Sequence, residues 1–186
     1  MPYQVIRSGR KTLALELGPK GLLVRAPFAV TQAQIEGFVR SNAAWIASRQ
    51  AKLEKAMEAC ASTERLTAEE LHALADRALA VIPERVAFYA PKVGVSYGRI
   101  TIRNQKTKWG SCSAKGNLNF NCLLMLAPPE VVDSVVVHEL CHRKEMNHSE
   151  WFYAEVLRVF PDYWKWNRWL KENGTALLCR MTGGFP

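Results

Sequence analysis

Three of the four histidines in this chain of 186 residues lie within one short segment, and a glutamate directly follows the first of them. The four residues of interest are His138, Glu139, His142 and His148. On an α-helix, residues four apart share one face, so His138 and His142 can direct imidazole nitrogens at a single ion. Histidine nitrogen is a common zinc ligand. The segment therefore predicts a zinc site.

The third ligand is expected to be His148, which follows six residues after His142 and beyond the end of the helix. The alternative is a glutamate on the next helix, either Glu150 or, if that helix packs alongside, Glu155. The chain must turn to bring His148 back, and Asn147 is expected to make this turn in a left-handed conformation.

Three protein ligands leave one position on a zinc ion for water, whose pKa the ion lowers. Glu139 is expected to accept the proton of this zinc-bound water as it attacks a peptide carbonyl, and then to deliver the proton to the leaving group. The oxyanion needs a hydrogen-bond donor, and Tyr153, Arg103 and Lys108 are unranked candidates. The predicted chemistry is hydrolysis.

The helix that carries His138 is expected to begin at Pro128-Pro129, because proline suits the first turn. Its apolar residues surround it on most sides, so we expect it to be buried. Buried His138, Glu139 and His142 would then need partners, which a metal site supplies.

Other elements should flank this helix. Strands are predicted at residues 95–103, 108–113 and 118–125. Downstream, Ser149 is expected to cap a helix, and a last helix over residues 163–173 should stop at Gly174. The tail from Thr175 is expected to be loosely ordered.

The N-terminal region predicts a small antiparallel β-meander followed by a helix. Its strands are expected at residues 3–8, 11–17 and 22–25. Thr31 and Gln34 have capping-box spacing at the start of the helix. We place a boundary near residue 62, which gives an N-terminal domain of residues 1–62 and a hydrolase domain of residues 63–186.

The hydrolase domain should open with another helix. Thr67 and Glu70 form a second capping-box pattern. Pro83 is expected to kink or restart this helix, and Pro91 and Gly94 to end it.

Composition bounds the partners and the compartment. The net charge of +8 and the pI near 9.4 favour anionic partners, nucleotide or nucleic acid among them. No apolar run approaches the roughly 20 residues of a membrane span, and the N-terminus lacks the pattern of a signal peptide. Five cysteines at irregular spacing argue against a disulfide framework. The expected location is therefore cytoplasmic.

Several short motifs together resemble the YgjP-like metallopeptidase family, with SprT-like and WLM proteases as more distant relatives. The motifs are Lys106-Thr107-Lys108-Trp109-Gly110-Ser111-Cys112-Ser113, Asn121, Pro128, His138-Glu139-Leu140-Cys141-His142 and Asn147-His148-Ser149. Residues 6–13 and 24–27 also resemble the opening strands of the family.

The resemblance implies an α+β, zincin-like core in which an antiparallel sheet backs the zinc helix. It implies His138, His142 and His148 as zinc ligands and Glu139 as the catalytic residue. Residues 109–113 would be a strand along whose edge an extended substrate pairs, or they would only pack the sheet against the helix. The substrate-binding candidates are Trp109, Gly110, Ser111, Cys112, Arg103 and Lys108.

Three functions compete at this point. The leading hypothesis is a zinc-dependent peptidase that acts on a peptide or protein. The second is a zinc hydrolase of a nucleotide or another phosphate-containing substrate, whose phosphates basic residues would neutralise; the candidates are Arg7, Arg10, Lys11, Arg103 and Lys108. The third is a nucleic-acid-associated module with structural zinc, which is disfavoured because structural sites usually fill all four ligand positions.

Overall fold

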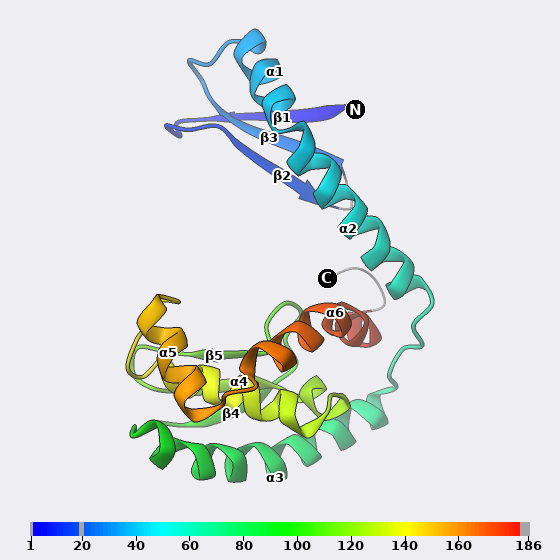
Figure 1. Cartoon of the computed structure of the whole chain (residues 1–186). Helices are drawn as coiled ribbons and strands as arrows, with labels where there is room; N and C mark the ends of the chain where they lie inside the picture. The colour runs from blue at the N-terminus through cyan, green and yellow to red at the C-terminus, as the bar shows by residue number, and fades with distance from the viewer. Residues whose placement is uncertain (1, 19–20, 183–186) are drawn as a thin grey trace. The chain divides into compact units, whose positions relative to one another are not determined.

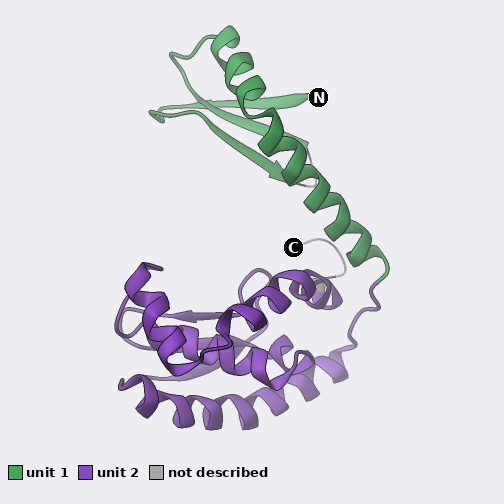
Figure 2. Ribbon diagram, in the orientation of Figure 1, with its two compact units in different colours: residues 1–62, 185 green, residues 63–184, 186 purple. Residues whose placement is uncertain are grey.

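The computed structural model describes residues 2–18 and 21–182 of the chain (Figure 1). These residues form two units: unit 1 extends to Ser62, and unit 2 begins at Thr63 (Figure 2). Each unit has a three-stranded sheet and a buried apolar cluster of its own. None of the helices in the described part of the chain is long and apolar enough to cross a membrane. The architecture is mixed α+β, as the sequence predicts.

Unit 1 opens with a mixed sheet. Its strands are β1 (Tyr3–Ser8), β2 (Ala14–Gly18) and β3 (Gly21–Pro27). β3 lies in the middle, parallel to β1 and antiparallel to β2. The predicted antiparallel meander is therefore wrong, because a meander would place β2 between the other two strands. β3 suits the central place because its alternate residues Leu22, Val24 and Ala26 are buried.

Two helices complete unit 1. α1 (Gln32–Ser41) begins with the predicted capping box, in which the side chains of Thr31 and Gln34 each accept a backbone hydrogen bond from the other residue. α2 (Ala43–Ala61) follows after Asn42. Ile35 of α1 packs with residues of β3 in a small core. In α2, by contrast, Ile46 is the buried residue, so most of this helix is free of the core.

Unit 2 begins with α3 (Ala68–Val93), which has the predicted capping box of Thr67 and Glu70. The helix continues through Pro83 and Pro91 and ends at Gly94, whose φ of 79° is left-handed. The expected end at Gly94 is therefore confirmed, whereas the helix neither restarts at Pro83 nor ends at Pro91. Each proline removes one backbone donor, but the helix keeps a long apolar face against the core. That face comprises Leu74, Ala78, Ile82, Val86, Tyr89, Ala90 and Val93.

The second sheet is also mixed. Its strands are β4 (Ile100–Arg103), β5 (Gly110–Cys112) and β6 (Leu118–Asn121). β6 is central, parallel to β4 and antiparallel to β5, so the expectation of an antiparallel sheet is wrong. The third strand is shorter than predicted because the Asn121 side chain accepts a hydrogen bond from the Leu123 amide. That bond caps the 3₁₀ helix η1 (Cys122–Leu126).

Three further helices surround the site. They are α4 (Pro129–Cys141), α5 (Glu150–Val159) and α6 (Tyr163–Thr182). α4 is the central one: it packs against α3, α5, α6 and β5, and Figure 1 shows it between α3 and the later helices. Its start at the proline pair and its burial agree with the prediction.

The last helix is longer than expected. Gly174 lies inside α6 and does not stop it, so residues 175–182 are helical and not loosely ordered. The reason is packing: a Cβ atom built at residue 174 would lie 3.1 Å from Cζ2 of Trp109. Gly174 therefore allows α6 to lie against the Trp109 ring, which is a tertiary role for a residue that the sequence suggested as a helix stop.

Candidate metal centre

The C-terminal end of α4 brings polar side chains into a buried environment. Residues 131–137 of the helix are buried, mostly valine, and they hold it in the core. At its end Glu139 is only 5% exposed and His142 only 9% exposed. Polar groups at such positions are costly unless they have partners. The burial of these polar side chains therefore indicates that they have polar partners or a bound ion.

The three histidines converge. Nε2 of His138 lies 3.1 Å from Nε2 of His148, and one ring nitrogen from each of the three residues lies within 4.8 Å of the others. Two nitrogens on one tetrahedral zinc ion, each bound at 2.0–2.1 Å, would be about 3.3 Å apart. Among the described residues this group has the geometry to hold a metal ion, and the histidines suit zinc chemically.

Hydrogen bonds on the opposite side of two rings fix their orientation. Nδ1 of His142 lies 3.1 Å from the carbonyl oxygen of Glu145, which can only accept, so Nδ1 carries the proton. Nδ1 of His138 lies 2.9 Å from Oη of Tyr163, and Nδ2 of Asn167 donates to the same oxygen at 3.0 Å. With both Nδ1 atoms engaged in this way, each Nε2 faces the other histidines. This is the arrangement that orients metal-binding histidines.

Tyr163 and Asn167 are residues that the sequence did not single out. Both lie on α6, and their spacing of four residues places them on one helical face. A polar pair at that spacing is a weak signal, because α6 also carries other polar residues such as Lys165, Arg168 and Lys171. It gains meaning only once α6 is known to pack on α4.

Burial also sets the protonation states. Burial first, and then the charges of His142 and His148, lower the pKa of His138 to about 3, which favours the neutral ring that binds metals. Burial likewise lowers the pKa of His142. Burial raises the pKa of Glu139 to about 8, and the nearby charge of Lys108 acts in the opposite direction.

The loop that returns His148 is held differently from the prediction. Among the described residues only glycines have positive φ, so Asn147 is not left-handed. Instead, the side chain of Glu145 accepts a hydrogen bond from the Asn147 amide at 3.2 Å, while its carbonyl contacts His142. Glu145 thus forms the turn with both its backbone and its side chain.

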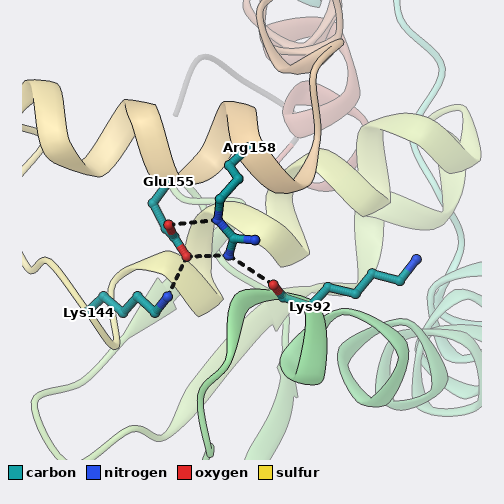
Figure 3. Close-up of polar contacts among 4 residues, drawn as sticks. All are labelled: Lys92, Lys144, Glu155 and Arg158. Carbon is teal, nitrogen blue, oxygen red and sulfur yellow. Dashed lines mark hydrogen bonds and ion pairs between the residues drawn. The ribbon is translucent and has the colours of Figure 1, made fainter.

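Glu155, the alternative third ligand, forms ion pairs with Lys144 and Arg158. Its carboxylate accepts hydrogen bonds from Lys144 at 2.5 Å and from Arg158 at 2.6 and 3.0 Å (Figure 3). Arg158 also donates to the carbonyl oxygen of Lys92 at the end of α3. The hydrogen bond from Arg158, followed by Lys144, lowers the pKa of Glu155 to about 2. Neither Glu155 nor Glu150 belongs to the histidine group.

A cavity of about 240 Å³ adjoins His138 and Glu139. Its lining residues are Lys108, Trp109, Gly110, Ser134, Val135, His138, Glu139, Tyr163, Asn167 and Leu170. Three of the predicted substrate-binding residues, Lys108, Trp109 and Gly110, are therefore among them. Gly110 is especially close: a Cβ atom built there would lie 2.6 Å from Oε1 of Glu139.

The other predicted substrate-binding residues do not line this cavity. Ser111 accepts a hydrogen bond from Asn119 at 3.2 Å, and Arg103 donates to Asn119 at 3.1 Å. The Cys112 thiol contacts the Ser113 carbonyl. β5 nevertheless lies at the edge of its sheet, so its outer backbone groups have no strand partner among the described residues. Tyr153, an oxyanion candidate, stacks on His148 instead.

The cysteines give a weaker argument for the compartment than the sequence suggested. The free thiols among the described residues belong to Cys112, Cys122 and Cys141. Cys60 and Cys179 do not carry free thiols. The irregular spacing of five cysteines therefore does not by itself indicate a reducing environment.

Comparison with known proteins gives a family. A model of the YgjP-like metallopeptidase domain matches residues 62–173, which include the histidines, Glu139 and β5. The chain belongs to this family. The resemblance found in the sequence is thereby confirmed for these residues, whereas the resemblance of residues 6–13 and 24–27 lies outside the match. The YgjP-like chain is thus a member of a metallopeptidase family with three histidines that could hold a metal ion.

Two other comparisons add less. Among solved structures, the metallopeptidase zymogen jannalysin of Methanocaldococcus jannaschii is 21% identical, with a TM-score of 0.45; the match covers 50% of this chain and 95% of that one. The metallopeptidase zymogen abylysin of Pyrococcus abyssi is 23% identical, with a TM-score of 0.45, and the match covers 50% of this chain and 94% of that one. A search of curated proteins gives no match.

Proposed function

We propose that this YgjP-like chain is a zinc-dependent peptidase in which His138, His142 and His148 hold the ion and Glu139 moves the proton. The observation that supports it best is the convergence of the three rings, with Nε2 of His138 and His148 3.1 Å apart beside a buried carboxylate. The two oriented Nδ1 atoms agree with this proposal, because they leave Nε2 as the ligand atom.

A zinc ion in this place would supply a Lewis acid that polarises the peptide carbonyl and acidifies a water molecule. The residues of the chain do the rest. Glu139 accepts the proton of the attacking water on its carboxylate and delivers it to the leaving amine. Without a cation, burial holds the pKa of Glu139 at about 8. A nearby cation lowers a carboxyl pKa, so Glu139 would be ready to accept a proton near neutral pH.

The cavity and β5 offer a place for a peptide. An extended substrate would pair with the free edge of β5, next to the cavity that Trp109 and Gly110 help to line. Glycine at residue 110 keeps this strand close to Glu139. Lys108 is the oxyanion donor that the geometry favours, because among Lys108, Arg103 and Tyr153 it alone lines the cavity.

The phosphate hypothesis gains no support from the same geometry. Of its basic residues only Lys108 lines the cavity. Arg103 is bound to Asn119, and Arg7 in unit 1 donates to the carbonyl oxygens of Pro27, Phe28 and Val30.

The test compares Glu139→Gln with Glu150→Gln, a matched change at an exposed residue near the site. Each protein is assayed with a peptide library and with a panel of nucleotides, and its zinc content is measured. We expect Glu139→Gln to retain zinc and lose peptide cleavage, and Glu150→Gln to retain both. Release of phosphate that depends on Glu139, without peptide cleavage, would overturn the proposal.

A further inference from the structure

Unit 1 has a groove between β2 and α2, far in sequence from the histidines. Its volume is about 430 Å³, larger than the 240 Å³ beside Glu139. On the strand side it is lined by the consecutive residues Leu15, Glu16 and Leu17. Side chains alternate between the two faces of a strand, so a groove that touches all three residues runs along the edge of β2.

One side of β2 has no strand neighbour in the described part of unit 1, and α2 is the helix that packs against this strand. β2 lies at one side of its sheet, next to β3 only, so half of its backbone N–H and C=O groups have no strand partner in the described part of unit 1. Such an edge is a template for another strand. Its five residues would accommodate a segment about 17 Å long.

The opposite wall is a stripe of α2. Trp45, Ser48, Arg49 and Lys52 line the groove, and their spacing places them on one helical face. Trp45 is 46% exposed, and Arg49 and Lys52 are also exposed. Within residues 2–18 and 21–182, neither Arg49 nor Lys52 takes part in an ion pair. The stripe therefore combines an unused aromatic ring with two unpaired positive charges.

The charge of unit 1 points in the same direction. Residues 1–62 contain nine Lys and Arg against four Asp and Glu, a net charge of +5 out of the +8 of the whole chain. The acidic residue that lines the groove is Glu16, which is paired with Arg25 at 2.5 Å. The groove is thus basic on the α2 side, and its acidic residue is already neutralised.

We propose that this groove binds an extended acidic peptide segment, which adds to β2 as a further strand. Acidic side chains of the segment contact Arg49 and Lys52, and an apolar side chain packs on Trp45. Single-stranded nucleic acid is the competing occupant, since it also uses cations and aromatic rings. It is disfavoured because it makes no use of the free strand edge.

The test is binding of a labelled peptide to the full chain, followed by fluorescence anisotropy. The peptide is about five to seven residues long, matched to β2, with one Val and two Glu at every second position, so that these three side chains lie on the same face; Ser stands between them, and both ends are blocked. The protein carries Glu139→Gln, so cleavage at the proposed active site does not enter the measurement and the result is independent of the peptidase proposal.

Arg49→Glu should weaken binding by roughly tenfold or more, because it removes one favourable charge and adds a repulsive one. Arg40→Glu is the control, since Arg40 is also exposed in unit 1 but does not line the groove. Replacing Glu by Gln in the peptide, or methylating its amide nitrogens, should abolish binding.

Four results would overturn the proposal. They are no binding of the acidic peptide, equal binding of the Gln peptide, equal loss in Arg40→Glu and Arg49→Glu, and binding of a single-stranded oligonucleotide in place of the peptide.

Discussion

Gly110→Ala tests the closeness of β5 to Glu139 with the smallest possible change. A Cβ atom at residue 110 would lie 2.6 Å from Oε1 of Glu139, 2.7 Å from Cγ and 2.9 Å from Cδ. Such distances are sub-van-der-Waals, so the strand or the carboxylate must shift by several tenths of an ångström. Glu139 is 5% exposed and has little room to yield. We expect overpacking to lower the free energy of unfolding by about 1–3 kcal/mol.

The same shift should also reduce catalysis. A misplacement of about 1 Å can cost on the order of a hundredfold in rate, so peptide hydrolysis should fall by ten- to a hundredfold on that scale. Zinc content should remain, because the three atoms nearest to the built Cβ all belong to Glu139 and none to a histidine. Denaturant unfolding, turnover and metal analysis measure the three effects separately.

Gly37→Ala is the control for Gly110→Ala. Gly37 lies inside α1 with nothing within 4 Å of the Cβ position, so alanine should stabilise the helix by about 0.5–1 kcal/mol. Wild-type stability and wild-type turnover in Gly110→Ala would refute the argument that β5 confines the Glu139 carboxylate.

Three further predictions concern the residues around the metal centre. His138→Ala should reduce zinc from about one ion per chain to a trace in metal analysis, and unchanged content would contradict the ligand assignment. Tyr163→Phe keeps the ring but removes the partner of His138 Nδ1, so zinc affinity should fall by about 10–100-fold in competition with a chelator; equal affinity would assign Tyr163 to packing alone. Glu155 has a pKa of about 2 against an ordinary 4.5, so its stabilising effect is present above pH 4.5 and is lost as pH falls toward 2. Glu155→Gln should therefore lose about 1 kcal/mol at neutral pH and show a flatter acid decline in thermal unfolding, whereas parallel curves would contradict the ion-pair account.

Local signals in the sequence predicted the parts of the fold that depend on neighbouring residues. The capping boxes at Thr31 and Thr67 are formed within one turn, and the start of α4 needs only its prolines. The buried character of α4 follows from its valines. For the site, the helical spacing of His138 and His142 already requires their rings to share a face.

The features that were predicted wrongly or not at all depend on tertiary structure. In each sheet the central strand pairs along both of its edges, and the hydrophobic periodicity of a strand does not indicate how many neighbouring strands it has. Asn121 ends β6 through its side chain, and Glu145 forms the turn before His148 in place of Asn147. The bond of Tyr163 to His138 joins residues 25 apart, so no local pattern could reveal it.

Gly174 does not line the cavity, yet it contacts Trp109, which does. Any side chain at residue 174 would push on the Trp109 ring, which lines the cavity and directly precedes Gly110. Among relatives of this chain, a change at this single helical residue would therefore alter which substrates fit, while every residue of the proposed metal site stayed the same. Substrate preference could then diverge through α6 without passing through an inactive intermediate.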